Sequence, residues 1–313
     1  MLRSRLRYIN RRPCDLIAIQ SMHTHPTPRV GGIAVFGAIV IGVIFSSASI
    51  SGTHTDFVLV SSLLFFVGLA EDFGFQMSPV HRLLAAVVSS LLVILVLGFY
   101  LPRTGVPIID IVIDHWAVGI PLTVLVTAGI SNGFNLIDGV NGLASFTAIV
   151  AALALSQIAE VSGYATMAHL SMLIAVGILG FFIVNYPFGL IFLGDAGAYT
   201  IGFVLSWFGI AILINVPNVS PWAILLTLFW PIADTLLAIY RRLRRRQNVC
   251  APDRLHVHQI TLRGLEICFF GQNCRHITNP MTTLVMSPFV IAPQIVGVLF
   301  WDQNQNAFLA VLI

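Results

Sequence analysis

Lysine is absent from the sequence, and charge of either sign is scarce. All 16 basic residues are arginine, and together with 13 acidic residues they make up 9% of a 313-residue chain. Without lysine there is no Schiff-base former and no lysine anchor for phosphate, although arginine can still bind phosphate bidentately. A soluble domain carries about 25% charged residues. A chain with so few charged residues is mostly apolar. A water-soluble globule is therefore excluded, because it needs polar cover, and a disordered chain is excluded, because it needs high charge and low hydrophobicity.

Cysteine is also rare. None of the four cysteines is spaced as C-x-x-C, so neither a zinc knuckle nor a redox pair is predicted. The topology derived below places all four in the cytoplasm, where thiols stay reduced. They are expected to be free thiols: Cys14, Cys250, Cys268 and Cys274.

Long apolar runs take the place of charge. Hydrophobic residues make up 57% of the chain and the mean hydropathy is +0.92. Runs of about 20 residues indicate membrane-spanning helices rather than barrel strands. We expect an all-α, polytopic membrane protein with one integral membrane domain over residues 1–313 and about nine spans. The predicted spans are Val30–Ile50, Thr53–Ala70, Leu83–Tyr100, Ala117–Ile137, Leu143–Ala159, Tyr164–Tyr186, Ala196–Val216, Trp222–Tyr240 and Thr283–Trp301.

Arginine placement predicts the orientation. If the arginine-rich segment 1–29 is cytoplasmic, then 15 of the 16 arginines lie on the cytoplasmic side, many of them in segment 1–29 and in a polar cytoplasmic loop at 241–282. Only Arg103 falls outside. Because cytoplasmic loops carry an excess of arginine and lysine, this orientation is strongly favoured.

Five polar clusters fall at the cytoplasmic ends of different spans in this topology. Taken singly, each is typical of a turn or a hydrated helix end, and the arginine run 241–246 is typical of a positive-inside anchor. Together they bring several carboxylates, glycines and an H-x-H sequence to one membrane face. Hard oxygen ligands of this kind bind Mg²⁺, which often bridges phosphates, and glycine beside an acid allows a phosphate to approach the backbone. The pattern predicts phosphoryl transfer at a membrane surface. The clusters are segments 23–32, 71–72, 135–142, 192–197 and 252–259.

The chain resembles the polyprenyl-phosphate N-acetylhexosamine-1-phosphate transferases, which include the phospho-MurNAc-pentapeptide translocase and the undecaprenyl-phosphate GlcNAc-1-phosphate transferases. The resemblance covers about residues 20–265, and its sequence boxes follow the order of the family. The matching segments are His25-Pro-Thr-Pro-Arg-Val-Gly-Gly32, Gly68-Leu-Ala-Glu-Asp72 with Ser78-Pro-x-x-Arg82-Leu, Asn135-x-x-Asp-Gly-x-x-Gly-Leu-Ala144, Phe192-Leu-Gly-Asp-Ala-Gly197, and Pro231-x-x-Asp234 with Pro252-Asp-Arg-x-His-x-His258.

This resemblance implies transfer of a sugar-1-phosphate from a UDP-sugar to a polyprenyl phosphate, with release of UMP. It implies Mg²⁺, with Mn²⁺ as an alternative, held by Asp195 and Asp138. Asn135 would help to hold the metal and the nucleotide diphosphate. Asp72 would lie beside the acceptor phosphate, as an organiser rather than a base, because a phosphate monoester is largely ionised near neutral pH.

The remaining implied site residues surround these. His256 and His258 would contact the donor and share one side of an extended loop, with a zinc pair as the alternative. For Asp234, a nucleotide contact and an arginine partner are equally favoured. Glu71 joins the catalytic acids. The other implied substrate-binding residues are Arg82, Arg254, His25 and Arg29.

Four departures from the family pattern favour a divergent priming enzyme of surface polysaccharide over the peptidoglycan translocase. They are Glu71 in the D-D box, Arg82 where lysine is familiar, Asn141 in place of a second acid, and Gln259 in place of a third histidine. The family usually has a span before its first box, and only 24 residues precede His25. The first helix is therefore expected to be missing or replaced.

Two other classes of function compete with the transferase hypothesis. A transporter should carry its acids within spans, whereas only Asp234 and His169 fall there. A catalytically impaired scaffold of a polysaccharide assembly complex is the second alternative. The partners implied by the resemblance are a UDP-sugar, a polyprenyl phosphate and the lipid bilayer, with a homodimer left open and nucleic acid not expected. The implied location is the bacterial inner membrane, with the catalytic face in the cytoplasm.

Overall fold

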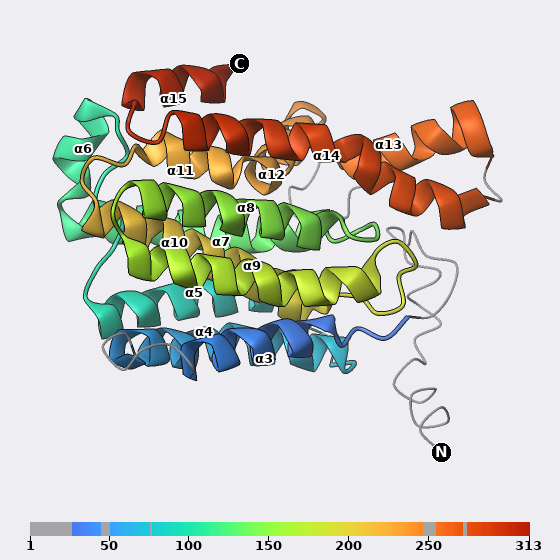
Figure 1. The fold of residues 1–313 in the computed structure, drawn as a ribbon, viewed down its shortest axis with the longest axis horizontal. Helices are drawn as coiled ribbons and strands as arrows, with labels where there is room; N and C mark the ends of the chain where they lie inside the picture. The colour runs from blue at the N-terminus through green and yellow to red at the C-terminus, as the bar shows by residue number, and fades with distance from the viewer. Residues whose placement is uncertain (1–26, 45–50, 76, 247–254, 272–273) are drawn as a thin grey trace.

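The computed structural model describes residues 27–44, 51–75, 77–246, 255–271 and 274–313, and every regular element in these ranges is helical. The helices lie side by side along the long axis of the molecule (Figure 1). Their bounds are α3 (Gly31–Ile44), α4 (Ser51–Asp72), α5 (Pro79–Leu97), α6 (Pro107–Ile113), α7 (Trp116–Ile137), α8 (Leu143–Val161), α9 (Ala165–Asn185), α10 (Gly194–Asn215), α11 (Pro221–Thr227), α12 (Phe229–Arg244), α13 (Val257–Leu265), the π-helix η1 (Glu266–Phe270), α14 (Arg275–Leu299) and α15 (Asn304–Leu312).

The prediction of an all-helical, multi-pass membrane protein is confirmed. Within the described residues, six helices are long and apolar enough to cross a bilayer, or seven if one bent pair counts as a single span. The predicted count of about nine spans and the orientation stay predictions. The six are α5, α7, α8, α9, α10 and α14.

Helix α10 is the central element of the bundle. It packs against α3, α4 and α7, and 89% of its most apolar window is buried inside the protein. Small residues allow this contact, since a Cβ on Gly68 of α4 would lie 2.6 Å from the backbone of Ala196. The N-terminus of α10 is thereby held against the C-terminal end of α4, which carries Glu71 and Asp72.

The predicted span Trp222–Tyr240 is not one continuous helix. It is divided at Leu228 into α11 and α12, whose axes are bent by 83°. Pro231 explains the break, because its nitrogen carries no hydrogen for the carbonyl of Thr227 and its ring occupies the space of that carbonyl. The bend brings Asp234, on α12, toward the end of the bundle that carries the other acids.

The predicted loop 241–282 is also more ordered than expected. It contains α13, η1 and the first turns of α14, which lie at one end of the bundle in Figure 1. A bond between Arg275 Nε and the buried Glu266 carboxylate, 2.8 Å long, joins the two arms of this helical hairpin. The helices of this region were not predicted, because they are amphipathic rather than uniformly apolar and so do not give a long apolar run.

Arg103, the arginine that the topology places outside, has a structural role. Its guanidinium donates hydrogen bonds to the carbonyl oxygens of Leu213, Val216 and Val219, at 2.6, 3.0 and 2.7 Å. These carbonyls belong to the last turn of α10 and the loop after it, where a helix leaves acceptors without intrahelical donors. The exception to the arginine asymmetry is thus a cap on the central helix.

Candidate active site

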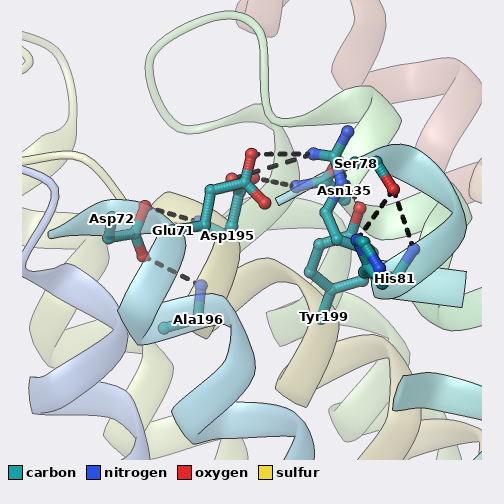
Figure 2. Close-up of polar contacts among 9 residues, drawn as sticks. Glu71, Asp72, Ser78, His81, Asn135, Asp195, Ala196 and Tyr199 are labelled. Atoms are coloured by element: carbon teal, nitrogen blue, oxygen red, sulfur yellow. Dashed lines mark hydrogen bonds and ion pairs between the residues drawn. The ribbon is translucent and has the colours of Figure 1, made fainter. Parts of the chain in front are cut away.

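The N-terminus of α10 is capped by a carboxylate from another helix. Asp72, the last residue of α4, accepts the backbone N–H of Asp195 on Oδ1 at 3.0 Å and that of Ala196 on Oδ2 at 2.9 Å. Figure 2 shows both bonds. The first N–H groups of a helix have no intrahelical acceptors and carry partial positive charge, so an anion is stabilised there. Both Asp72 oxygens therefore act in organising the site.

Gly194 makes this capping contact possible. Its φ of +74° lies in the left-handed region, which an L side chain rarely adopts. A Cβ at this position would also lie 2.5 Å from Asp72 Oδ2. We predicted that glycine beside the acids allows a phosphate to approach the backbone. In the structure, the group that lies close to the backbone of Gly194 is the Asp72 carboxylate.

Asp195, in the first turn of α10, is held by an amide. Asn135, in the last turn of α7, donates from Nδ2 to Asp195 Oδ1 at 2.5 Å. The amide oxygen of Asn135 in turn accepts the hydroxyl of Tyr199 at 3.2 Å. Figure 2 shows Asn135 between these two side chains of α10. The second oxygen of Asp195 is left facing the basic group described next.

Arg82, on α5, joins two of the acids. Its Nη1 lies 3.3 Å from Glu71 Oε1 and 3.9 Å from Asp195 Oδ2. The side chains are only partly exposed, by 22%, 14% and 12% for Arg82, Glu71 and Asp195. Two of the departures from the family pattern, the longer acid and the arginine, therefore contact each other.

Asp138 completes the acid cluster. It ends α7, as the C-cap residue, and accepts a hydrogen bond from the backbone N–H of Gly194. Burial, and then the negative charge of Asp195, raise the pKa of the Asp138 carboxyl to about 7, while the charge of Arg29 opposes this shift. The sequence prediction that Asp72, Asp138 and Asp195 converge is thus matched by the geometry, and Arg29 lies close enough for its charge to act on the group.

The donor set fits a hard divalent cation. Asp195 and Asp138 offer carboxylate oxygens, and their mutual repulsion would be relieved by a positive charge. No three histidine, cysteine or acidic side chains in the described part of the chain could enclose a metal by themselves. Mg²⁺ commonly takes one or two carboxylates and completes its shell with water and substrate phosphates. Asn135 directs its Nδ2 toward Asp195, so its contribution is to orient the acid.

A second polar cluster lies where α12 meets α13. Asp234 Oδ2 is 2.6 Å from His256 Nδ1, and Asp234 Oδ1 accepts the backbone N–H of Val257 at 2.9 Å. The partners of Asp234 among the described residues are therefore His256 and the backbone of Val257, and the predicted alternatives, a nucleotide contact and an arginine partner, stay predictions. The predicted extended loop is wrong, because α13 begins at Val257. The Asp234 carboxylate caps this helix, which explains how it starts in a polar stretch.

His256 and His258 still lie together, with parallel rings whose centroids are 5.8 Å apart. Each is 1% exposed, and His256 Nε2 and both ring nitrogens of His258 have no hydrogen-bond partner among the described residues. His258 packs against Gly139, where a Cβ would collide with its ring. His258 thus contacts the residue next to Asp138. The described residues offer no third ligand for the alternative zinc pair.

Two predicted site residues, His25 and Arg254, lie outside the described residues. Asn141, one of the departures, has a structural role: its Nδ2 donates to the carbonyl of Pro187 at 2.9 Å, and its backbone N–H donates to Asn279.

Tyr199 is the site residue that the sequence prediction missed. Its spacing of four residues from Asp195, which puts both on one helix face, is the signal that could have found it.

Several curated proteins resemble this chain over most of its length. A probable undecaprenyl-phosphate N-acetylglucosaminyl 1-phosphate transferase of Bacillus subtilis is 28% identical over 242 residues, which cover 76% of this chain and 66% of the relative. A decaprenyl-phosphate N-acetylglucosaminephosphotransferase of Mycobacterium tuberculosis is 28% identical over 278 residues, covering 78% and 67%. An undecaprenyl-phosphate alpha-N-acetylglucosaminyl 1-phosphate transferase of Yersinia pestis is 27% identical over 249 residues, covering 77% and 67%.

The chain spans about two thirds of the length of these relatives. The aligned length nevertheless includes the match to a family model. The sequence model of glycosyl transferase family 4 matches residues 54–213, which is just over half of the chain and includes Asp72, Asp138 and Asp195. The protein therefore belongs to glycosyl transferase family 4.

Proposed function

We propose that this protein transfers a sugar-1-phosphate, such as N-acetylhexosamine-1-phosphate, from a UDP-sugar to a polyprenyl phosphate and releases UMP. The observation that carries the proposal is the convergence of Asp72, Asp138 and Asp195 at the N-terminus of α10, beside Arg82. Family membership and the names of the relatives support the same reaction class. We place this site on the cytoplasmic face of a bacterial inner membrane, because the arginine asymmetry puts it there.

The reaction exchanges one phosphoanhydride for another. An oxygen of the polyprenyl phosphate attacks the phosphorus that bears the sugar, and the bond from that phosphorus to the bridging oxygen breaks. UMP leaves with that oxygen, and the sugar becomes attached through a diphosphate to the lipid. The acceptor phosphate is largely ionised near neutral pH, so charge is conserved without a strong base. The protein's main tasks are positioning and charge compensation.

The residues divide these tasks by position. Asp195 and Asp138 would hold Mg²⁺, or Mn²⁺ in its place. The metal, when bound, supplies positive charge to the diphosphate of the donor. Arg82, 3.9 Å from Asp195 Oδ2, is placed to contact a donor phosphate that the cation would hold beside this acid. Asp72 holds the end of α10 that carries Asp195.

The histidine cluster supports a donor-binding role. His256 and His258 have buried ring nitrogens without partners, and buried polar atoms of this kind are costly unless a ligand or water satisfies them. His258 packs against Gly139, next to Asp138, so a donor held at the acid cluster would extend toward the two histidines. Asp234 keeps His256 in one orientation through the bond to Nδ1.

A UMP-release assay tests the proposal directly. Membranes containing the protein are given undecaprenyl phosphate and a panel of UDP-sugars, with and without Mg²⁺. UMP release that needs both the lipid and one UDP-sugar supports the transferase. Absence of turnover with every donor would reject it and leave the scaffold hypothesis. The Mg²⁺ arm tests the cofactor separately, because activity that is unchanged by chelation would reject the metal role alone.

A further inference from the structure

Three side chains form a continuous chain of hydrogen bonds that ends on Asp195. The hydroxyl of Tyr199 donates to Asn135 Oδ1 at 3.2 Å, and Asn135 Nδ2 donates to Asp195 Oδ1 at 2.5 Å. Tyr199 is only 3% exposed. Tyr199 and Asp195 lie one turn apart on α10, so they face α7 together, and Asn135 bridges them from α7.

We propose that Tyr199 is a positioning residue that acts through Asn135 to orient Asp195 for its divalent cation. This inference rests on the metal role assigned to Asp195 in the proposed function. Tyr199 has no contact with Asp72 or Asp138 among the described interactions. Its side chain is also hydrogen-bonded with Arg82, which lies beside Asp195 Oδ2, so the Asn135 amide is its route to Oδ1 of Asp195.

The two ends of an asparagine amide have similar shapes but opposite hydrogen-bonding roles. The Asp195 carboxylate requires a donor, and the Tyr199 hydroxyl satisfies the amide oxygen that then points the other way. The two bonds reinforce each other, because each polarises the amide in the same direction. Asp195 Oδ1 is thereby held by Asn135, whereas Oδ2 lies on the side of Arg82, 3.9 Å from its Nη1.

Loss of the tyrosine hydroxyl would leave the amide oxygen of Asn135 without its donor. A buried amide oxygen without a donor is unfavourable, so the Asn135 side chain would be stabilised by turning this oxygen toward another donor or a cation. Asn135 would then stop fixing Oδ1, and Asp195 would sample other rotamers. Interactions that orient a metal ligand from behind typically change metal affinity by about 10- to 100-fold. We expect Tyr199→Phe to weaken cation binding about tenfold while the ring keeps its packing.

The test measures Mn²⁺ binding to the purified full chain in detergent by electron paramagnetic resonance, without substrate. We expect the dissociation constant of Tyr199→Phe to rise about tenfold over that of the unchanged protein. Tyr100→Phe is the matched control, because the hydroxyl of Tyr100 also bonds a protein oxygen, the carbonyl of Asp114 at 2.8 Å, away from the acid cluster. Asp195→Asn is expected to abolish this binding.

A second variant separates positioning from general damage. Asn135→Ala removes the bridge, so adding Tyr199→Phe to it should change Mn²⁺ affinity no further. A purely structural role of Tyr199 would instead lower affinity by the same factor in both backgrounds. This comparison also covers the case in which Tyr199→Phe alone is poorly folded, since thermal unfolding without Mn²⁺ is measured for every variant.

Several results would overturn the inference. They are a dissociation constant for Tyr199→Phe within twofold of the unchanged protein, additive effects in the double variant, or absence of Mn²⁺ binding to the unchanged protein. The measurement is independent of turnover. Failure of UMP release with every donor would therefore reject the proposed function while the Mn²⁺ comparison still decides the role of Tyr199.

Discussion

Asp72 and Asp195, 123 residues apart in sequence, are joined by a hydrogen bond from the backbone N–H of Asp195 to Asp72 Oδ1 at 3.0 Å. The second oxygen of Asp72 accepts the next N–H, that of Ala196. An acid at the end of α4 thus fixes the first turn of α10, on which Asp195 stands. The Asp72 side chain thus brings a negative charge to the site, caps α10 and fixes the position of Asp195.

The capping role makes a prediction about stability. Asp72→Ala should lower the free energy of unfolding by about 1 kcal/mol, the usual cost of losing a helix cap. Asp72→Asn should lose less, because its amide oxygen can still accept one N–H. Thermal unfolding in detergent, in metal-free buffer, measures both. Asp302→Ala is the control, since Asp302 is exposed and lies near α15. Equal melting temperatures for Asp72→Ala and the unchanged protein would contradict the capping role.

Asp195 itself is predicted to be essential for turnover. Asp195→Asn keeps the size of the side chain but removes the negative charge that attracts a cation. UMP release should fall by more than about a hundredfold, because charge compensation by a metal contributes several kcal/mol to phosphoryl transfer. Membrane insertion should be preserved, as measured by the amount of protein in the membrane fraction. Near-normal turnover in this variant would refute the metal role.

Glu71 and Arg82 are predicted to act as a pair. Their charged atoms are 3.3 Å apart, so Glu71→Gln and Arg82→Gln should have effects on UMP release that do not add. We expect a coupling energy of about 1 kcal/mol from the four kcat/KM values of a double-mutant cycle. The control cycle combines Glu71→Gln with Arg275→Gln, which breaks the separate Glu266 pair. Additive effects in the first cycle would show that the two departures are independent.

Much of the fold was predictable because apolar runs report spans directly. The predicted spans Leu143–Ala159 and Tyr164–Tyr186 differ from α8 and α9 by at most two residues at any end. The bent pair α11–α12 was not predicted, since Pro231 is tolerated inside many membrane helices and its effect depends on neighbouring packing. Helix α13 was missed because its N-terminal cap, Asp234, comes from another element.

The acids of the site were predictable from the ordered boxes, but their partners were not. Asp72, Asp138 and Asp195 stand in recognisable segments, whereas the bond from Tyr199 to Asn135 depends on how α7 and α10 are rotated against each other. The prediction that a phosphate approaches the glycines beside these acids stays a prediction. Gly139 and Gly194 do permit a close approach, but the groups that approach them are the side chains of His258 and Asp72.

His258 predicts a loss of stability in acid. Burial lowers its pKa to about 4, with a further lowering by His256 and an opposing effect from Asp234, whereas the pKa in an unfolded chain is about 6.5. Between these values the unfolded chain binds the proton and the folded chain does not, so stability falls as the pH drops from 6.5 to 4. The shift corresponds to about 3 kcal/mol.

The pH dependence of thermal unfolding tests this in purified protein. The melting temperature of the unchanged protein should fall steadily below pH 6.5, and His258→Phe should reduce that fall, because it removes the titrating group. His276→Phe is the matched control: His276 is exposed on α14, so its removal should leave the slope unchanged. An equal slope for His258→Phe and the unchanged protein would show that the buried ring does not titrate in this range.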